Sequence, residues 1–366
     1  MNMNKDKAYL EMAYGLAQKA KGWVSPNPYV GAVIVKQGAI IGHGYHAGPG
    51  QPHAETIALQ RAGTAARGST LYLTLEPCTH WGRTPPCIDS VLAAKPKRVV
   101  VSDYDPNPRV MKQGIRSLEE HGIDVDFGKL KEKNRILNEV YNKYIASKIP
   151  FVTLKAGISL DGKMATHTHS SRWISSARTR EYTHLLRGEN DAIMTGVTTI
   201  IEDDPELTIR HREWREKKLT RIVLDSRLRF PLGAKLLETQ SRGKIIVFTK
   251  EPQSSPKVHQ LKNKNVEVVS QEGSGRTIDL QHVLSWLGNN GIASLLVEGG
   301  GKLHTSFLES RLADKIVLAI APMFIGGTEA PALYGGEGVK SLKDSLRLRR
   351  MFAFQVENDI IIEGDF

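Results

Sequence analysis

The sequence has little cysteine and no long apolar run, and each scarcity excludes a class of protein. Only 2 of its 366 residues are cysteines, too few for the disulfide framework of a small secreted domain. The longest apolar runs, such as 30–35 and 316–322, are strand-sized and fall short of the roughly 20 residues that a membrane helix needs. The amino terminus lacks the apolar core and small-residue cleavage site of a secretory signal. We therefore expect a cytoplasmic protein without a membrane partner.

The composition is that of a folded protein rather than a disordered one. Hydrophobic residues make up 40% of the chain and charged residues 24%, which is enough apolar material for a real core. At a prior of about 150 residues per domain, the length predicts two or three domains. The 50 Lys and Arg exceed the 39 Asp and Glu, and the net charge of +11 favours anionic ligands. Nucleic acid and small phosphorylated molecules both satisfy that preference.

Helix-like and strand-like segments alternate in two blocks. The first block runs from a helical pattern over residues 5–21, through a hairpin around Lys36-Gln37-Gly38, to a charged helical stretch over 129–147. The second block restarts with a strand at Phe151 and ends in a hairpin around Asn358-Asp359. The pre-proline bias against helix places the boundary near Lys148-Ile149-Pro150. We predict two α/β domains, residues 1–147 and 148–366.

His53, Cys78 and Cys87 form a candidate set of zinc ligands. Imidazole and thiolate suit zinc, and three protein ligands leave a fourth position for water, as in catalytic sites. His53 should lie at the cap of a helix, from which Glu55 reaches back toward the metal-bound water. Zinc lowers the pKa of such a water to about 7, and a carboxylate can carry its proton to a departing amine. The pattern matches the signature of nucleobase deaminases, which is His-x-Glu followed by Pro-Cys-x-x-Cys. It differs in one respect, because eight residues separate the two cysteines here and two separate them in the signature.

Other interpretations of these residues exist. The cysteines alone could be small buried residues, and a lone His-x-Glu occurs by chance in many chains. A structural zinc, or a zinc-stabilised module that only binds nucleotides, would not require Glu55 beside an open coordination position. The positive charge leaves a further alternative, a nucleic-acid editing deaminase with an accessory RNA-binding domain. The combination of residues favours a catalytic zinc.

A basic run over residues 210–221 is the strongest local concentration of charge. It holds six Lys or Arg residues against Glu213 and Glu216, and we expect most of it to be a solvated face. Nucleic-acid binding would call for base-stacking aromatics beside such a patch, and Trp214 is the only one within it. The run therefore gives little support to a nucleic-acid partner.

The second block lacks the G-x-G-x-x-G fingerprint of a Rossmann dinucleotide site. Instead, Glu298-Gly299-Gly300-Gly301 follows an apolar strand and precedes a helix, where glycines let the backbone approach a pyrophosphate. A plain strand-to-helix turn is the alternative. Ser226 with Arg227 or Arg229 follows another strand and suits the 2′-phosphate of NADPH, since arginine binds phosphate. This favours NADPH over NADH.

Several longer motifs carry a resemblance to a known family. They are Ser25-Pro26-Asn27-Pro28, His53-Ala54-Glu55, the stretches 75–80 and 82–87, Asp105-Pro106-Asn107-Pro108, Ser159-Leu160-Asp161-Gly162-Lys163, Asp203-Asp204-Pro205 and Val297-Glu298-Gly299-Gly300. Over nearly the whole chain the sequence resembles the bifunctional riboflavin-biosynthesis family, a diaminohydroxyphosphoribosylaminopyrimidine deaminase joined to an aminophosphoribosyluracil reductase. The resemblance implies an amino-terminal cytidine-deaminase-like three-layer α/β/α domain and a carboxy-terminal dihydrofolate-reductase-like α/β domain.

For the first domain the resemblance implies one zinc ion on His53, Cys78 and Cys87, with Glu55 as the proton shuttle. The implied substrate contacts are Asn27, His46, His80, Arg83, Asp105 and Asn107. An amide and a carboxylate suit the polar edge of a pyrimidinone, and Arg83 with His80 suits a 5′-phosphate. The implied reaction is hydrolytic deamination of 2,5-diamino-6-ribosylamino-4(3H)-pyrimidinone 5′-phosphate to 5-amino-6-ribosylaminouracil 5′-phosphate.

For the second domain the resemblance implies NADPH-dependent reduction of the ribosyl group to a ribityl group. Lys155 or Glu298 would steer a proton, and the choice between them stays open. The implied substrate contacts are Lys155, Ser171, Arg187, Leu207, Arg210 and Glu298. The expected cofactor contacts are Gly157, Trp173, Ser175, Thr199, Asp203, Ser226, Gly299, Gly300 and Gly301. We expect a small phosphorylated substrate, no nucleic acid, and a homo-oligomer of unspecified size.

Overall fold

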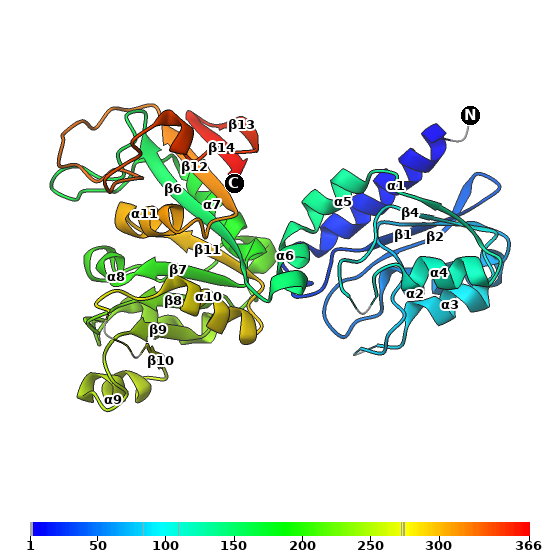
Figure 1. Cartoon of the computed structure of the whole chain (residues 1–366), viewed down its shortest axis with the longest axis horizontal. Coiled ribbons are helices and arrows are strands. Elements are labelled where there is room, and N and C mark those ends of the chain that lie inside the picture. The colour runs from blue at the N-terminus through cyan, green and yellow to red at the C-terminus, as the bar shows by residue number, and fades with distance from the viewer. Residues whose placement is uncertain (1–2, 83, 109, 272, 274) are drawn as a thin grey trace. The chain divides into compact units, whose positions relative to one another are not determined.

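The computed structural model describes residues 3–82, 84–108, 110–271, 273 and 275–366 (Figure 1). The chain forms two compact units, Met1–Lys148 and Ile149–Phe366. Among the described residues, no helix is both long and apolar enough to cross a membrane. Each unit has its own sheet and its own core.

The first unit is built on a five-stranded sheet in the order β2-β1-β3-β4-β5. Its strands are β1 (Gly31–Lys36), β2 (Ala39–Tyr45), β3 (Thr70–Leu73), β4 (Arg98–Val101) and β5 (Asp124–Phe127). The predicted hairpin is the antiparallel pair β1 and β2, whereas β3, β4 and β5 are parallel. Both faces of β1 are buried, because the consecutive residues 32–35 are all apolar rather than alternating with polar ones.

Helices cover both faces of this sheet, which confirms the three-layer prediction. On one face α1 (Met3–Ala17) packs Leu10 and Ala13 against Val33 and Val35. The opposite face carries α2 (Ala54–Ala62), α3 (Cys87–Ala94) and α4 (Gln113–Glu120). The charged stretch predicted over 129–147 is two helices, α5 (Lys131–Leu137) and α6 (Glu139–Ser147).

Two glycines of β2 bring α2 unusually close to the sheet. A Cβ atom at Gly42 would lie 2.3 Å from the carbonyl oxygen of Ala58, and one at Gly44 would lie 2.6 Å from that of Ala54. Any side chain at these positions would push the helix outward. The glycines therefore set the position of the helix that begins directly after His53.

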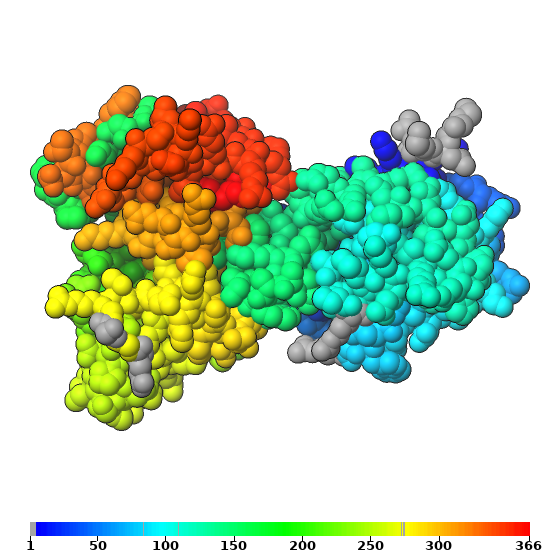
Figure 2. Space-filling view, viewed as in Figure 1, coloured from blue at the N-terminus to red at the C-terminus, as the bar shows by residue number. Residues whose placement is uncertain are grey.

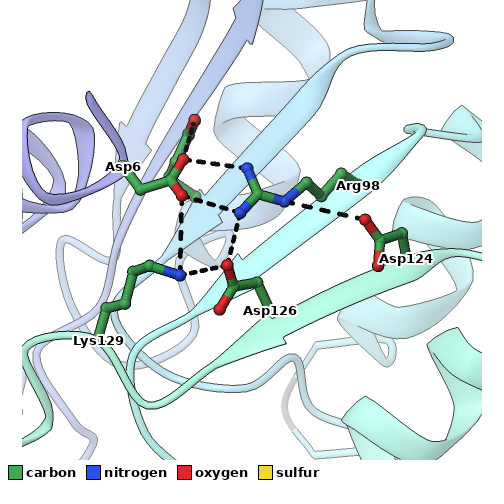
Figure 3. Close-up of polar contacts among 6 residues, drawn as sticks. Asp6, Arg98, Asp124, Asp126 and Lys129 are labelled. Atoms are coloured by element: carbon green, nitrogen blue, oxygen red, sulfur yellow. Dashed lines mark hydrogen bonds and ion pairs between the residues drawn. The ribbon is translucent and has the colours of Figure 1, made fainter. Parts of the chain in front are cut away.

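An ionic network joins α1 to β4 and the end of β5 on the face of the sheet that α1 covers (Figure 3). The Arg98 guanidinium from β4 contacts Oδ2 of Asp6 at 2.8 Å and Oδ2 of Asp126 at 2.6 Å, and Lys129 also pairs with Asp126. Burial alone would raise the pKa of Asp6, but hydrogen bonds from Arg98 and Tyr72 lower it below its ordinary value. The network fixes the amino-terminal helix on the sheet.

The second unit contains a nine-stranded sheet in the order β10-β9-β8-β7-β11-β6-β12-β14-β13, and Figure 1 shows these strands in succession. The strands are β6 (Phe151–Ser159), β7 (Ala192–Gly196), β8 (Thr220–Leu224), β9 (Ile245–Thr249), β10 (Glu267–Ser270), β11 (Ser294–Glu298), β12 (Lys315–Ala321), β13 (Arg350–Val356) and β14 (Asp359–Asp365). All neighbours from β10 to β12 are parallel, and β14 is antiparallel to both β12 and β13. The last two strands are the predicted carboxy-terminal hairpin.

Helices also cover both faces of the second sheet. They are α7 (Ala177–Glu189), α8 (Val197–Asp203), α9 (Pro256–Lys262), α10 (Leu280–Asn289) and α11 (Gly301–Glu309). Residues of α8 and α9 share one core cluster, and residues of α10 and α11 share another. The carboxyl ends of the parallel strands lie along one edge, where open α/β sheets bind their ligands.

Most of the basic run over 210–221 is a solvated face, as expected, because its exposed residues include Arg210, Arg212, Arg215 and Lys218. Three of its other residues are drawn into the fold. Arg221 is fully buried, with its guanidinium donating to Oγ1 of Thr239 at 2.7 Å. Trp214 is buried, and Lys217 donates to two backbone carbonyls at 2.8 Å. Strand β8 begins inside the run and buries Arg221, a placement that local charge density does not reveal.

Candidate functional sites

The three expected metal ligands converge in the first unit. Nδ1 of His53 lies 2.9 Å from Sγ of Cys87 and 3.5 Å from Sγ of Cys78. All three ligand atoms lie within 4.8 Å of one another. His53 caps α2 with extended backbone and Cys87 begins α3, so two helix amino termini face the cluster. Zinc bonds of about 2.0 Å to nitrogen and 2.3 Å to sulfur suit this donor set.

The electrostatics of the cluster favour thiolate. Hydrogen bonds from the Cys87 thiol and from His53 lower the pKa of the Cys78 thiol to about 4. Both helix termini add partial positive charge. The site can therefore offer an anionic sulfur to a divalent cation.

Glu55 lies next to this cluster and has an unsatisfied oxygen. The side chain is only 3% exposed, and its Oε2 atom has no hydrogen-bond partner among the described residues. Burial, with a smaller contribution from Cys78, raises the pKa of Glu55 to about 7. A buried carboxylate with a free oxygen suits a group that exchanges a proton with a bound water.

Thr84 and His46 both contact the imidazole of His53. Oγ1 of Thr84 lies 3.2 Å from Nε2 of His53, so Nε2 carries the proton when Nδ1 binds a metal. His46 lies edge-on to His53, with ring centroids 4.9 Å apart. Its Nε2 atom is 3.0 Å from the amide nitrogen of Asn27. The Thr84 contact was not expected from the sequence.

Asp105 is held in a cradle of hydrogen bonds. Its Oδ1 atom accepts from the backbone amide of Asn107 at 2.8 Å and from the Tyr141 hydroxyl at 2.7 Å. Its own amide donates to Oε1 of Glu76 at 2.9 Å. Burial raises the pKa of Asp105, and the two hydrogen bonds to Oδ1 oppose this effect. The cradle fixes the carboxylate against one wall of the cavity.

A single cavity in the first unit contains most of the expected residues. Its lining includes Asn27, His46, His53, Glu55, Cys78, His80, Asp105 and Asn107. Cys87 lies behind this wall, 99% buried, at the start of α3. Arg83 falls outside the described residues, so its predicted phosphate contact remains a prediction.

A second cavity lies in the carboxy-terminal unit. Glu298 at the end of β11 is the register partner of Lys155 on the neighbouring strand β6. The Glu298 carboxylate forms two hydrogen bonds of 2.8 Å with the Arg187 guanidinium, and both side chains are 14% exposed. Burial alone would raise the pKa of Glu298, but Arg187 lowers it below its ordinary value. Burial lowers the pKa of Lys155.

The lining of this cavity contains many of the residues expected for the second domain. They are Lys155, Gly157, Ser171, Trp173, Ser175, Arg187, Asp203, Leu207, Arg210 and Glu298. Trp173 is 66% exposed, and the Arg180 guanidinium lies 4.3 Å from its ring centroid. His184 also lines the cavity and accepts a hydrogen bond from the Arg210 amide at 3.3 Å. The sequence had not indicated Arg180 or His184.

Five expected cofactor contacts lie outside that lining. Thr199 is in α8 after β7, Ser226 follows β8, and Gly299, Gly300 and Gly301 follow β11. All five follow the carboxyl ends of adjacent parallel strands. Gly301 has a packing reason of its own, since a Cβ there would lie 2.0 Å from the carbonyl oxygen of Ala332. A Cβ at Gly300 would meet open space.

Family models match both units. Residues 3–103 match the model described as the cytidine and deoxycytidylate deaminase zinc-binding region. Residues 150–362 match the RibD C-terminal domain. The second match alone covers more than half of the chain, and the first contains the entire His53, Cys78 and Cys87 cluster.

Whole-chain relatives agree with these matches. The riboflavin biosynthesis protein RibD of Aquifex aeolicus is 44% identical over 357 residues, which cover 98% of this chain and 97% of the relative. The Acinetobacter baumannii RibD structure has a TM-score of 0.88 and 33% identity, and covers 100% of this chain and 99% of its own. A Thermotoga maritima deaminase/reductase structure has a TM-score of 0.86 and 32% identity, with the same coverage. The family resemblance predicted from the sequence motifs is confirmed.

Proposed function

The chain belongs to the bifunctional deaminase and reductase family RibD of riboflavin biosynthesis, and from this membership we propose which substrates its two cavities use. The first cavity deaminates 2,5-diamino-6-ribosylamino-4(3H)-pyrimidinone 5′-phosphate to 5-amino-6-ribosylaminouracil 5′-phosphate. The second reduces the ribosyl group of that product to a ribityl group with NADPH. The observation that carries the proposal is the unpaired, buried Oε2 of Glu55 beside the His53, Cys78 and Cys87 cluster.

In the first cavity, His53, Cys78 and Cys87 would hold zinc, which would supply Lewis-acid activation of water. Glu55, buried beside this cluster with an Oε2 atom unpartnered in the described part of the chain, would accept a proton and deliver it to the departing amine. Thr84 and His46 keep the surrounding rings in place. Asn27 and Asp105 form hydrogen bonds with the polar edge of the pyrimidinone.

In the second cavity, NADPH would supply the hydride that reduces C1 of the ring-opened ribose. Lys155 is the better proton donor of the two candidates, since burial lowers its pKa toward neutrality. Glu298 accepts two hydrogen bonds from Arg187 and stays ionised, so it is suited to orient Lys155 or the ribose hydroxyls. Arg187 also donates to the carbonyl oxygen of Thr208, which leaves Arg210 as the more accessible arginine for a phosphate.

NADPH is the proposed cofactor because Ser226 is followed by two exposed arginines, Arg227 and Arg229. A guanidinium favours the 2′-phosphate that distinguishes NADPH from NADH. The open space beside Gly300, at the amino terminus of α11, supports a nearby site for the pyrophosphate.

A homo-oligomer is also proposed. Strand β13 is the last strand of its sheet, and Met351, Phe352 and Phe354 on it are 61%, 60% and 41% exposed. The carboxy-terminal hairpin, red in Figure 2, lies at the molecular surface. An apolar edge strand favours pairing with a second copy. Sedimentation of wild type and Phe352→Lys would test this, with dissociation of the variant expected.

Incubation of the purified protein with the diaminopyrimidinone substrate tests the main proposal. Ammonia should appear first, and NADPH added afterwards should be oxidised in an equal amount. A zinc chelator should stop ammonia release and spare reduction of supplied deaminated intermediate. Absence of ammonia from this substrate while RNA is deaminated would instead support an editing enzyme. Equal turnover with NADH would contradict the cofactor assignment.

A further inference from the structure

One wall of the first cavity comes from a helix that the zinc-binding region does not include. Tyr141, Tyr144 and Ile145 of α6, with Lys148 just after it, all line the cavity. Their spacing of three, four and seven residues from Tyr141 places them on one face of the helix. The deaminase family match ends at residue 103, so the match covers the metal cluster and omits this wall.

Tyr141 makes the most specific contact of that wall. Its hydroxyl donates to Oδ1 of Asp105 at 2.7 Å, and each side chain is only 7% exposed. The hydroxyl also interacts with the Asn107 side chain. Tyr141 therefore links the two residues of the Asp105-Pro106-Asn107-Pro108 loop that we expect to contact the substrate.

The contact restricts the carboxylate to one orientation. Oδ1 of Asp105 accepts both the Tyr141 hydroxyl and the Asn107 amide, and no described residue donates to Oδ2. Glu76 holds the loop from the other side, because its Oε1 atom accepts from the amides of Asp105 and Lys112, each at 2.9 Å. One carboxylate oxygen is thus committed to the protein while the other remains available.

We propose that Tyr141 is a positioning residue of the deaminase, which binds Oδ1 of Asp105 so that Oδ2 receives a donor on the pyrimidinone ring. The proposal rests on the substrate proposed above. Zinc chemistry is carried by residues 53–87, whereas the selection of this ring depends on a helix more than 50 residues later in the chain. Preorganisation of the acceptor strengthens binding because the substrate need not reorient it.

Tyr141→Phe tests this role with minimal change in volume. Since a hydrogen bond to an ionised group is involved, KM for deamination should rise about 10-fold or more, with a smaller change in kcat. Zinc content and the rate of NADPH-dependent reduction in the same chain should equal those of wild type. Tyr14→Phe is the matched control, because it removes a buried hydroxyl that bonds Oγ of Ser102, away from the cavity.

A double-mutant cycle with Asp105→Asn separates positioning from general destabilisation. If Tyr141 acts through Asp105, its replacement should change KM far less in the Asp105→Asn background than in wild type. Additive effects, an unchanged KM in Tyr141→Phe, or an equal rise in Tyr14→Phe would each overturn the inference. Wild type that releases no ammonia would overturn the proposed function as well, whereas an active wild type matched by Tyr141→Phe would overturn the inference alone.

Discussion

The two cavities differ in how their chemistry is distributed along the chain. In the first, the clustered metal ligands and the proposed proton shuttle lie within residues 53–87, at the starts of α2 and α3 and in the loop after β3. In the second, the central ion pair joins Arg187 to Glu298, which are 111 residues apart. A compact cluster of metal ligands has a recognisable spacing, while an ion pair between distant elements has none. The comparison explains why residue chemistry alone indicated one site and only weakly indicated the other.

The sharpest test of this comparison is whether the two sites fail separately. Glu55→Gln removes the proposed proton shuttle and should lower the deamination rate about 10²- to 10⁴-fold. Zinc should remain bound, because Glu55 is not one of the three clustered ligands. Ammonia release, metal content and reduction of supplied deaminated intermediate measure these outcomes. A parallel loss of reduction would show that the two sites are not independent.

The ion pair of the second cavity should matter for both folding and reduction. Arg187→Met leaves the buried Glu298 carboxylate without its partner, which should cost about 3–5 kcal/mol of unfolding free energy. The rate of NADPH oxidation should also fall, while ammonia release should persist at a temperature at which the variant remains folded. Denaturant titration followed by both activities would measure the effect.

The double variant Arg187→Met with Glu298→Gln is the control for that prediction. It removes both charges, so it should recover part of the lost stability without recovering reduction. If the single and double variants are equally unstable, packing rather than charge is responsible.

The first unit also contains a partly buried set of ion pairs, the ionic network of Figure 3, which lies outside its cavity and stabilises the fold. Arg98→Met leaves the buried Asp6 carboxylate with only Lys129 and the Tyr72 hydroxyl as partners, and should lower the stability of this unit by about 2 kcal/mol. The exposed pair Arg116 and Glu120 provides the control, because Arg116→Met should change stability by less than about 0.5 kcal/mol. Thermal loss of deamination, compared with thermal loss of reduction, would localise the effect to the first unit.

His184 should give the smallest effect, a pH dependence of the second unit. Burial, with a smaller contribution from Arg187, lowers its pKa to about 4 from the ordinary 6.5. Between these values the unfolded chain binds a proton that the folded chain does not, so stability declines as pH falls from 6.5 toward 4. His184→Gln keeps an acceptor for the Arg210 amide and should reduce this decline. Melting followed at pH 7 and pH 5 would reveal it, with the exposed His259→Gln as the control that keeps the wild-type slope.

Much of the fold was predictable because its signals are local. The hairpin around Lys36-Gln37-Gly38 and the carboxy-terminal hairpin follow from turn residues and apolar periodicity. The placement of His53 at a helix cap followed from the chemistry expected of Glu55. The roles of Thr84 and Tyr141 were not predictable, since neither residue type indicates a partner 31 or 36 residues away.

Residue types and their spacing along the chain determined that this protein has two α/β units and that one of them can bind zinc. Both properties depend on short-range patterns, which can be recognised in the sequence without knowing which strands are neighbours. Tertiary structure alone decided that Arg221 is buried within a basic run, that Glu298 pairs with Arg187, and that Tyr141 reaches Asp105. Burial and long-range hydrogen bonds depend on which elements become neighbours, and that choice is made by packing of the whole domain.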